Sequence, residues 1–358
     1  MLFLCFLYKT ILKLNFSNAI TTWYENNKRD LPWRKTRDPY LIWLSEIILQ
    51  QTRVDQGLTY YLKFSDRFPT VQSMSNADES QVLKLWQGLG YYSRARNMHF
   101  TAKHICNNLN GEFPDNYAEL IKLKGVGEYT AAAVASFCFN EKKAVVDGNV
   151  FRVLSRYYGL HTPIDSSKGK KEFTRLANEL ICKEFPGNHN QAIMEYGALL
   201  CKPKKPHCSN CKLATSCIAF NKNEISKLPF KSKKIKQKKR YFNYFIVTDG
   251  KSVFFEQRNK KDIWEKLYQF PMIETNEEVH EIPENSILAN LEVAQIDIRT
   301  LKHILSHQII YAKFWLFKSA KPIDPNPNMN CVNIKDLDNY AVPKLVDNYL
   351  LEFFQLIN

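Results

Sequence analysis

Residues 123–152 read LKGVGEYTAAAVASFCFNEKKAVVDGNVFR, and this stretch indicates the fold more strongly than any other. Its glycine turn, residues 125–127, precedes an Ala-rich segment, residues 128–139, made of good helix formers without a breaker. Such a turn points unpaired backbone N–H groups outward from the helix start, where they can bind a phosphate. Asp147 follows beside a glycine, which lets another backbone approach the carboxylate. The stretch therefore suggests chemistry on a nucleic-acid backbone or sugar.

The bulk composition predicts a two-domain globular protein that binds an anionic partner. A chain of 358 residues is long enough for two domains with separate cores. Hydrophobic residues at 45% and charged residues at 24% are ordinary for such proteins. The net charge of +14 is not ordinary, and it favours nucleic acid, with an anionic membrane as the competing partner. Alternatively, the positive charge comes from solvated surface lysines that bind no partner.

The cysteines and the N-terminus argue against a secreted or membrane protein. Nine cysteines are an odd number, and four of them lie between positions 201 and 217, which favours a metal site in a reducing cytosol. Residues 1–14 are apolar but short for a membrane span, and two lysines interrupt them. They also lack the basic region and cleavage site of a signal peptide. We interpret them as an N-terminal extension or an upstream start.

A helix that begins at residues 38–39 carries a candidate acid. Asp38 and Pro39 form a helix-start signal, an N-cap acid followed by proline at the first helical position. Glu46 lies further along this helix, and its neighbours at helical spacing are largely apolar: Ile42, Trp43, Leu49 and Gln50. Burial raises the pKa of a carboxyl group until it can donate a proton near neutral pH. An ion pair with a distant Arg or Lys is the alternative role of Glu46.

Residues 78–111 read as two helices joined by a turn, GLGYYSRAR, that presents apolar and aromatic side chains. Leu89, Tyr91 and Tyr92 are residues that a loop does not normally expose. Side chains of this kind insert into a base stack when a nucleotide leaves it. Packing into the core is the alternative, more so for Tyr92 than for Tyr91.

Four cysteines are spaced C-x6-C-x2-C-x5-C: Cys201, Cys208, Cys211 and Cys217. Four thiolates this close in sequence can bind zinc or a cubane iron–sulfur cluster, and the spacing alone does not decide between them. A zinc ribbon usually pairs two CxxC knuckles, whereas this chain has one. The pattern therefore predicts a metal site of either kind.

Several stretches together resemble the helix-hairpin-helix superfamily of DNA glycosylases that includes endonuclease III, and within it the MutY family of adenine glycosylases. The stretches are GVGEYTAAA with VVDGNVFRVLSR, SEIILQQTRV (family SEVMLQQTQV), LPWR, NHNQAIMEYGALLC (family NQAMMDLGAMIC) and the cysteine loop. The resemblance begins near residue 15 and covers most of the chain. It implies an all-α glycosylase domain with an iron–sulfur loop, followed by a MutT-like α/β domain.

The resemblance also implies roles for individual residues. Glu46 would be the general acid and Asp147 would stabilise the oxocarbenium ion, with Tyr129 and Asn149 positioning the aspartate and the attacking water. The cysteine spacing is that of the family's 4Fe-4S cluster. DNA and substrate contacts are implied for Arg34, Gln51, Thr52, Leu89, Tyr91, Gly125, Gly127 and Gln191.

The C-terminal part changes character after a basic run, KSKKIKQKKR, within a linker placed at residues 221–240. Residues 15–220 would form the glycosylase domain and residues 241–358 the second domain. YFNYFIVTDGKSVFFEQR predicts a β-hairpin around Asp249 and Gly250, and LKHILSHQIIYAKFWLF predicts another strand pair. This part resembles a MutT-like (Nudix) domain without the metal-binding glutamates, so we predict no pyrophosphatase activity. Ser306 and His307 fall in the family's 8-oxoguanine loop, where Leu305 replaces a phenylalanine.

These features predict a monomeric base-excision repair enzyme of the bacterial cytoplasm, associated with the nucleoid and not with membranes. Its partner would be double-stranded DNA with adenine opposite 8-oxoguanine or guanine. Two alternatives remain. An endonuclease III-type glycosylase with lyase activity needs a lysine where this chain has Tyr129. A non-catalytic, cluster-containing DNA-binding protein would use both acids only as structural groups.

Overall fold

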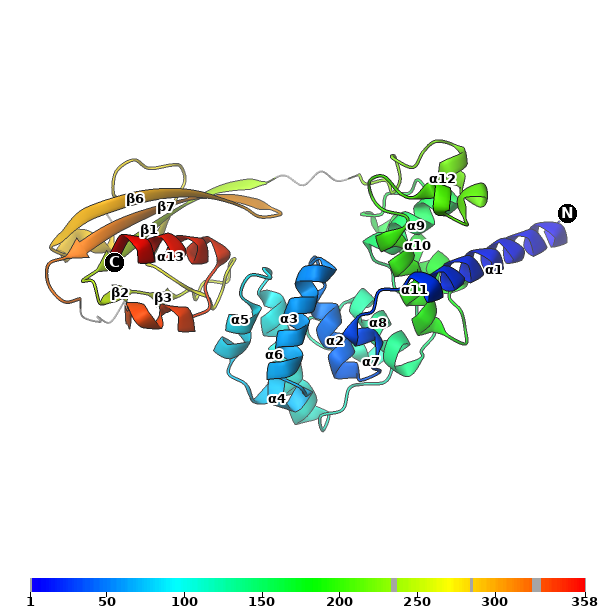
Figure 1. The fold of residues 1–358 in the computed structure, drawn as a ribbon, viewed down its shortest axis with the longest axis horizontal. Coiled ribbons are helices and arrows are strands. Elements are labelled where there is room, and N and C mark those ends of the chain that lie inside the picture. The colour runs from blue at the N-terminus through cyan, green and yellow to red at the C-terminus, as the bar shows by residue number, and fades with distance from the viewer. Residues whose placement is uncertain (1, 233–236, 284–285, 324–329, 358) are drawn as a thin grey trace. The chain divides into compact units, whose positions relative to one another are not determined.

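The computed structural model describes residues 2–232, 237–283, 286–323 and 330–357 (Figure 1). Its contacts divide the chain into two compact units. The first, here called the helical unit, comprises Met1–Asn76 and Phe100–Lys233. The second, the mixed unit, comprises Ala77–His99 and Lys234–Asn358. The segment 77–99 thus groups with the C-terminal residues, an arrangement that the sequence-based domain bounds do not include.

The described elements of the helical unit are helices. They are α1 (Leu2–Asn27), η1 (Pro32–Arg34), α2 (Pro39–Ile48), α3 (Val54–Arg67), α4 (Val71–Asn76), α7 (Tyr117–Leu120), α8 (Glu128–Phe139), α9 (Gly148–Tyr158), α10 (Ser167–Leu180), α11 (Pro186–Leu199), η2 (Cys208–Asn210), η3 (Ala214–Ser216) and α12 (Ile218–Asn221). Helix α6 (Ser93–Asn108) begins in the mixed unit and ends in this one.

The helix starts predicted from sequence are confirmed. Asp38 caps α2, because its side chain accepts a hydrogen bond from the Tyr40 amide at 2.8 Å, and Pro39 occupies the first helical position. Helix α10 ends at Leu180, and α11 begins at Pro186 with this proline at its first position. Helix α7, a turn and α8 form the predicted helix-hairpin-helix. Gly125 adopts φ +80° in that turn, a conformation that an L-residue rarely takes.

Apolar faces of α1, α8, α9, α10 and α11 form one core of the helical unit. Phe16, Leu154, Phe173 and Ala192 are fully buried within it. Helix α11 lies between α1 and α9, and its Gly197 lets it approach α9 closely. A Cβ at Gly197 would meet the Asn149 Cβ at 2.7 Å. This core therefore places α9, which follows Asp147, against α11.

The mixed unit combines α5 (Glu79–Trp86) and the start of α6 with strands and a C-terminal helix. Its other described elements are β1 (Lys238–Thr248), β2 (Ser252–Phe254), β3 (Glu256–Gln257), β4 (Tyr268–Gln269), β5 (Met272–Thr275), η4 (Ile287–Asn290), β6 (Val293–Ile304), β7 (Gln308–Ser319), β8 (Cys331–Asn333), η5 (Ile334–Asn339) and α13 (Lys344–Ile357).

Within the described residues, the main sheet has the order β6-β7-β1-β2-β8, and β5 also pairs with β1. Strands β1 and β7 are parallel, whereas the other pairs are antiparallel. The predicted hairpin at Asp249 and Gly250 is confirmed as β1–β2, and the predicted strand pair as the end of β6 with β7. Residues 305–307 connect these last two strands.

Side-chain alternation gives the sheet two apolar faces. Helix α13 covers one face (Figure 1), where Tyr349 stacks on Phe314 with ring centroids 4.1 Å apart. Phe245 and Trp315 belong to a second cluster. The basic run before the sheet is not wholly solvated, because Arg240 is buried between Asp262 and Glu274. Part of that run, residues 233–236, lies outside the described residues.

The N-terminal extension is helical, since α1 includes residues 2–14. Across the described part of the chain, none of the helices combines the length and the apolar character that a membrane crossing requires.

Candidate active site

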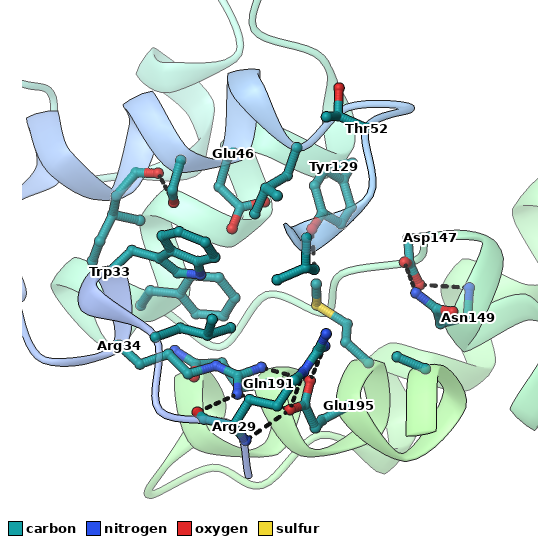
Figure 2. Close-up of a pocket in the computed structure, with 18 residues that line it drawn as sticks. Arg29, Trp33, Arg34, Glu46, Thr52, Tyr129, Asp147, Asn149, Gln191 and Glu195 are labelled. Atoms are coloured by element: carbon teal, nitrogen blue, oxygen red, sulfur yellow. Dashed lines mark hydrogen bonds and ion pairs between the residues drawn. The ribbon is translucent and has the colours of Figure 1, made fainter. Parts of the chain in front are cut away.

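Both predicted acids line one pocket of the helical unit (Figure 2). The pocket has a volume of about 210 Å³. Glu46 enters it from α2, Tyr129 from α8, and Asp147 and Asn149 from the start of α9. A larger hollow of about 550 Å³ shares Glu46, Tyr129 and Asp147 and also contacts the hairpin glycines, Gly125 and Gly127. The glycine turn and Asp147, from one stretch of sequence, are thus brought together with the distant Glu46.

Glu46 is buried, with 5% of its surface exposed. Desolvation disfavours the charged carboxylate and raises its pKa to about 7, while hydrogen bonding to Tyr129 and the Arg34 charge oppose this shift. The nearby Asp147 carboxylate raises it further. Glu46 is therefore protonated in a substantial fraction of molecules near neutral pH, as a general acid requires.

Asp147 is the N-cap of α9. One carboxylate oxygen accepts hydrogen bonds from the Asn149 and Val150 amides at 2.9 and 2.8 Å, and the other accepts one from Asn149 Nδ2 at 2.7 Å. Burial raises the pKa of Asp147 above its usual value, although these hydrogen bonds and the Arg152 charge oppose part of that shift. The side chain is a cap and is also exposed to the pocket. Its two carboxylate oxygens are already oriented before a ligand arrives.

Tyr129 lies between the two acids in Figure 2. Burial, followed by the charges of Glu46 and Asp147, raises the pKa of its phenol well above the usual value. The hydroxyl therefore stays protonated and can donate to the Glu46 carboxylate. It also lies 3.8 Å from the Met194 sulfur. Its hydrogen bond to Glu46 opposes, but does not cancel, the rise that burial causes in the pKa of that carboxyl group.

Arg152 connects the cysteine loop to Asp147, a role that the sequence did not reveal. Its Nε donates to the Cys201 carbonyl oxygen at 2.7 Å, and its Nη2 donates to Asn149 Oδ1 at 2.8 Å. Asn149 in turn donates to Asp147. Arg152 also donates to the Gly197 carbonyl oxygen at 2.8 Å. The buried Arg152 side chain thus fixes the amide of Asn149, which is consistent with the predicted positioning role of Asn149.

The floor of the pocket contains a second charged group that sequence reasoning missed. Glu195 is 1% exposed and pairs with Arg29 and Arg34 at 2.6 and 2.8 Å. Burial alone would raise its pKa, but hydrogen bonds from both arginines outweigh burial and lower it to about 2. The sequence contained one signal for this residue: Glu195 is the only acid in the run AIMEYGALL, which is otherwise largely apolar. Arg34, predicted as a substrate contact, lines the pocket through this ion pair.

Other predicted contacts lie around this pocket. Gln191 accepts a hydrogen bond from the Tyr24 hydroxyl at 2.6 Å, so its amide is oriented, and Thr52 lies at the rim. Trp33, from the LPWR stretch, is buried and lines the pocket. Gln51 is exposed at the end of α2 with φ +58°. A non-glycine residue held in this region is strained, and such strain is common at functional sites.

The predicted base-stack residues lie in the mixed unit. Tyr91 is 43% exposed and has φ +47°, whereas Leu89 and Tyr92 are 8% and 5% exposed. The core alternative considered for Tyr92 agrees with its burial, and Tyr91 is the exposed residue of the three. All three side chains line one hollow of the mixed unit together with Ser306 and His307. Ser306 and His307 are exposed in the loop between β6 and β7. Leu305, which replaces the aromatic residue of the family, packs partly against the core below α13.

The four predicted ligand cysteines line one small apolar cavity of about 30 Å³. Arg156 lies 3.4 Å from the Cys201 sulfur, and the Tyr196 hydroxyl lies 3.0 Å from the Cys211 sulfur. No three His, Cys, Asp or Glu side chains among the described residues are close enough to hold a single metal ion. Zinc would need sulfurs at about 2.3 Å from one point. A cluster with each thiolate on its own iron requires a wider arrangement.

Comparison with known proteins agrees with this geometry. Residues 44–181 match the family described as HhH-GPD superfamily base excision DNA repair protein, and residues 243–352 match the NUDIX domain. A thermostable thymine-DNA glycosylase has a TM-score of 0.56 and 31% identity, covering 60% of this chain and 99% of its own. An endonuclease III–DNA complex shares the fold, with a TM-score of 0.51, 23% identity, and coverage of 58% and 95%. Fold and site define a helix-hairpin-helix protein of base-excision repair.

The particular family follows from a full-length relative. The adenine DNA glycosylase of Buchnera aphidicola subsp. Baizongia pistaciae (strain Bp) is 37% identical over 88% of this chain and 90% of its own. The chain belongs to the adenine DNA glycosylase family. The fold class predicted from sequence, helical followed by α/β, is confirmed.

The pKa of Glu46 predicts the pH dependence of the reaction. Because an acid with a pKa of about 7 is protonated below that value, single-turnover base excision should fall about tenfold per pH unit above pH 7. Glu46→Gln should remove most activity and flatten the profile. Glu128→Gln, at an exposed acid on α8, should keep the wild-type profile. An unchanged profile in Glu46→Gln would exclude this acid.

Asp147→Asn separates the capping role of Asp147 from a catalytic one. Asparagine is as good an N-cap as aspartate, so the melting temperature should change little. The excision rate should nevertheless fall by at least about a hundredfold, because the negative charge is lost. Asp38→Asn, the same change at the cap of α2, should keep the rate. Retained excision in Asp147→Asn would reduce the residue to a structural cap.

Proposed function

We propose that this enzyme hydrolyses the N-glycosidic bond of adenine opposite 8-oxoguanine or guanine in double-stranded DNA. It would act as a monomer on nucleoid DNA of the bacterial cytoplasm. The observation that carries the proposal is the shared pocket of Glu46 and Asp147, one carboxyl group with a raised pKa and one held by amide donors. Membership in the adenine DNA glycosylase family supports the choice of base.

The chemistry requires a nucleotide turned out of the helix, since a base within the stack is inaccessible. Glu46 would protonate N7 of adenine, so that the base leaves in neutral form. The sugar then becomes cation-like, and Asp147 would stabilise that charge or attack it directly, as carboxylates do in glycoside hydrolysis. Asn149 and Tyr129 would keep Asp147 oriented and place the water. This division needs the two carboxyl groups in different protonation states.

Base recognition would come from the pocket floor. A purine edge offers both donors and acceptors, and the amide of Gln191 supplies both. Arg29 and Arg34 hold Glu195 ionised at the floor and already fill its two carboxylate oxygens with hydrogen bonds, so this ion pair would shape the pocket and orient the arginines. Thr52 and Gln51 at the rim would meet the opposite strand. Gly125 and Gly127 would present backbone amides to a phosphate.

The opposite base would be read by the mixed unit. Tyr91 would insert into the stack, with Leu89 behind it, while Ser306 and His307 hydrogen-bond the purine opposite adenine. Leu305 offers less area for stacking than an aromatic side chain. Discrimination between 8-oxoguanine and guanine would therefore depend mainly on these hydrogen bonds.

Cys201, Cys208, Cys211 and Cys217 would hold a 4Fe-4S cluster. Support comes from the cavity that the four cysteines share and from the Arg156 guanidinium beside Cys201. When bound, the cluster would fix the loop without a redox change, since hydrolysis transfers no electrons. Arg152 would then anchor Asn149 to a rigid loop.

Hydrolysis without strand cleavage is favoured over lyase chemistry by Tyr129. A lyase attacks the sugar with an amine, and this position holds a phenol whose pKa is raised by burial. Product strands should therefore stay intact until they are treated with alkali.

The decisive assay uses three duplexes with adenine opposite 8-oxoguanine, guanine or thymine. We expect adenine release from the first two and little from the third, measured as alkali-labile strand under single-turnover conditions. No release from the 8-oxoguanine duplex would refute the proposal. Strand cleavage without alkali would favour the lyase alternative.

The cluster is tested by metal analysis of the purified protein. We expect iron and inorganic sulfide in equal amounts, with visible absorbance that iron chelation removes. Cys211→Ser should lower both contents, whereas Cys182→Ser, at a cysteine outside the loop, should change neither. One zinc per chain without sulfide would contradict a cluster.

A further inference from the structure

The turn that carries Tyr91 is held rigidly from within the mixed unit. Gly88, Gly90 and Tyr91 all have positive φ, at 98°, 71° and 47°. Trp86 Nε1 donates to the Gly90 carbonyl oxygen at 3.0 Å. Arg94 Nη2 donates to the Gly90 carbonyl oxygen, and also to that of Leu89, at 3.1 Å. These bonds satisfy the carbonyls of a strained turn and keep Tyr91 exposed.

Polar side chains on both sides of this turn bind it to the C-terminal residues of the same unit. Gln87 Oε1 accepts from the Val342 amide at 3.2 Å, and its Nε2 donates to Asp347 Oδ1 at 3.0 Å. The Tyr92 hydroxyl donates to the Val342 carbonyl oxygen at 3.2 Å. Val342 is thus bonded through both its amide and its carbonyl, to residues on either side of the turn.

Arg96 adds a two-point contact with Glu265. Its Nη1 donates to the Glu265 carbonyl oxygen at 2.7 Å, and its Nη2 pairs with the carboxylate at 2.8 Å. The two side chains are 20% and 25% exposed, so water screens the pair only partly. A planar guanidinium bound at two atoms fixes direction as well as distance.

The tip of the turn meets the loop between β6 and β7. The Tyr91 hydroxyl hydrogen-bonds the Ser306 hydroxyl. Gln237 Nε2 donates to the Leu305 carbonyl oxygen at 2.9 Å, which holds that loop in turn. The residue expected to enter the base stack and a residue expected to contact the opposite base are therefore already neighbours.

We propose that Gln87 and Arg96 are positioning residues: they fix the Tyr91 turn to the C-terminal residues of the mixed unit and so keep Tyr91 beside Ser306, and the turn and the 305–307 loop then engage one mispair as a single rigid surface. This rests on the proposed function and extends it by locating opposite-base specificity in that connection. Pre-organisation removes the entropy cost of ordering two separate contacts, so the correct mispair gains affinity that other duplexes do not.

A charge exchange at Arg96 and Glu265 tests the connection. Arg96→Glu and Glu265→Arg alone should each lower the ratio of affinities for adenine opposite 8-oxoguanine and adenine opposite thymine by about tenfold, within the usual range for coupled contacts. The double exchange should restore most of the ratio. Arg299→Gln, which removes an exposed ion pair elsewhere in the unit, should leave it unchanged.

Two further measurements separate positioning from general stability. Gln87→Met keeps the side-chain size and removes both hydrogen bonds, and it should lower the same ratio without a charge change. Fluorescence of 2-aminopurine beside the opposite base should show reduced unstacking in the single variants and recovery in the double exchange. A loss of affinity equal for all duplexes, or no recovery in the double exchange, would overturn the proposal. Binding requires no turnover, so a wild-type protein that discriminates mispairs without releasing adenine would refute only the proposed chemistry.

Discussion

Burial of the Glu46 carboxyl group is the constraint on which the site depends. A carboxylate surrounded by apolar side chains is costly when ionised, and the chain meets that cost by raising its pKa instead of forming a tight ion pair. The same pocket holds Glu195 ionised between two arginines, with its pKa lowered to about 2. The pKa values of two glutamates in one cavity thus shift in opposite directions because their partners differ. An acid and a fixed charge coexist where water has little access.

Asp147 caps helix α9 and also lines the pocket. An N-cap aspartate stabilises its helix because it accepts amide hydrogen bonds, and those bonds also keep its charge localised at the pocket wall. Arg152 and Gly197 extend this arrangement inward: the first bonds Asn149 to the cysteine loop, and the second lets α11 approach. The orientation of one carboxylate thereby depends on residues from three distant segments.

In the mixed unit, polar contacts likewise join segments that lie far apart in the sequence. Its sheet and α13 supply a rigid platform, while Gln87, Tyr92 and Arg96 bind a helical segment to it. Strained residues at Gln51 and Tyr91 lie at the positions expected to meet DNA. Strain persists only where the surrounding structure over-determines it. Gln51 follows Gln50, whose side chain donates to Thr130, and Tyr91 hydrogen-bonds Ser306 in the 305–307 loop.

Local sequence determined the helix starts at Asp38 and Asp147, the glycine hairpin and the β1–β2 turn, because capping and turn preferences act within a few residues. Motif resemblance was enough to predict the family, and it singled out Glu46 and Asp147, which line one pocket. Tertiary structure alone decided that Glu195 joins Arg29 and Arg34, that Arg152 bridges Asn149 to Cys201, and that residues 77–99 group with the C-terminal residues. These contacts join residues far apart in the chain. Their energies depend on burial and distance, which no local pattern encodes.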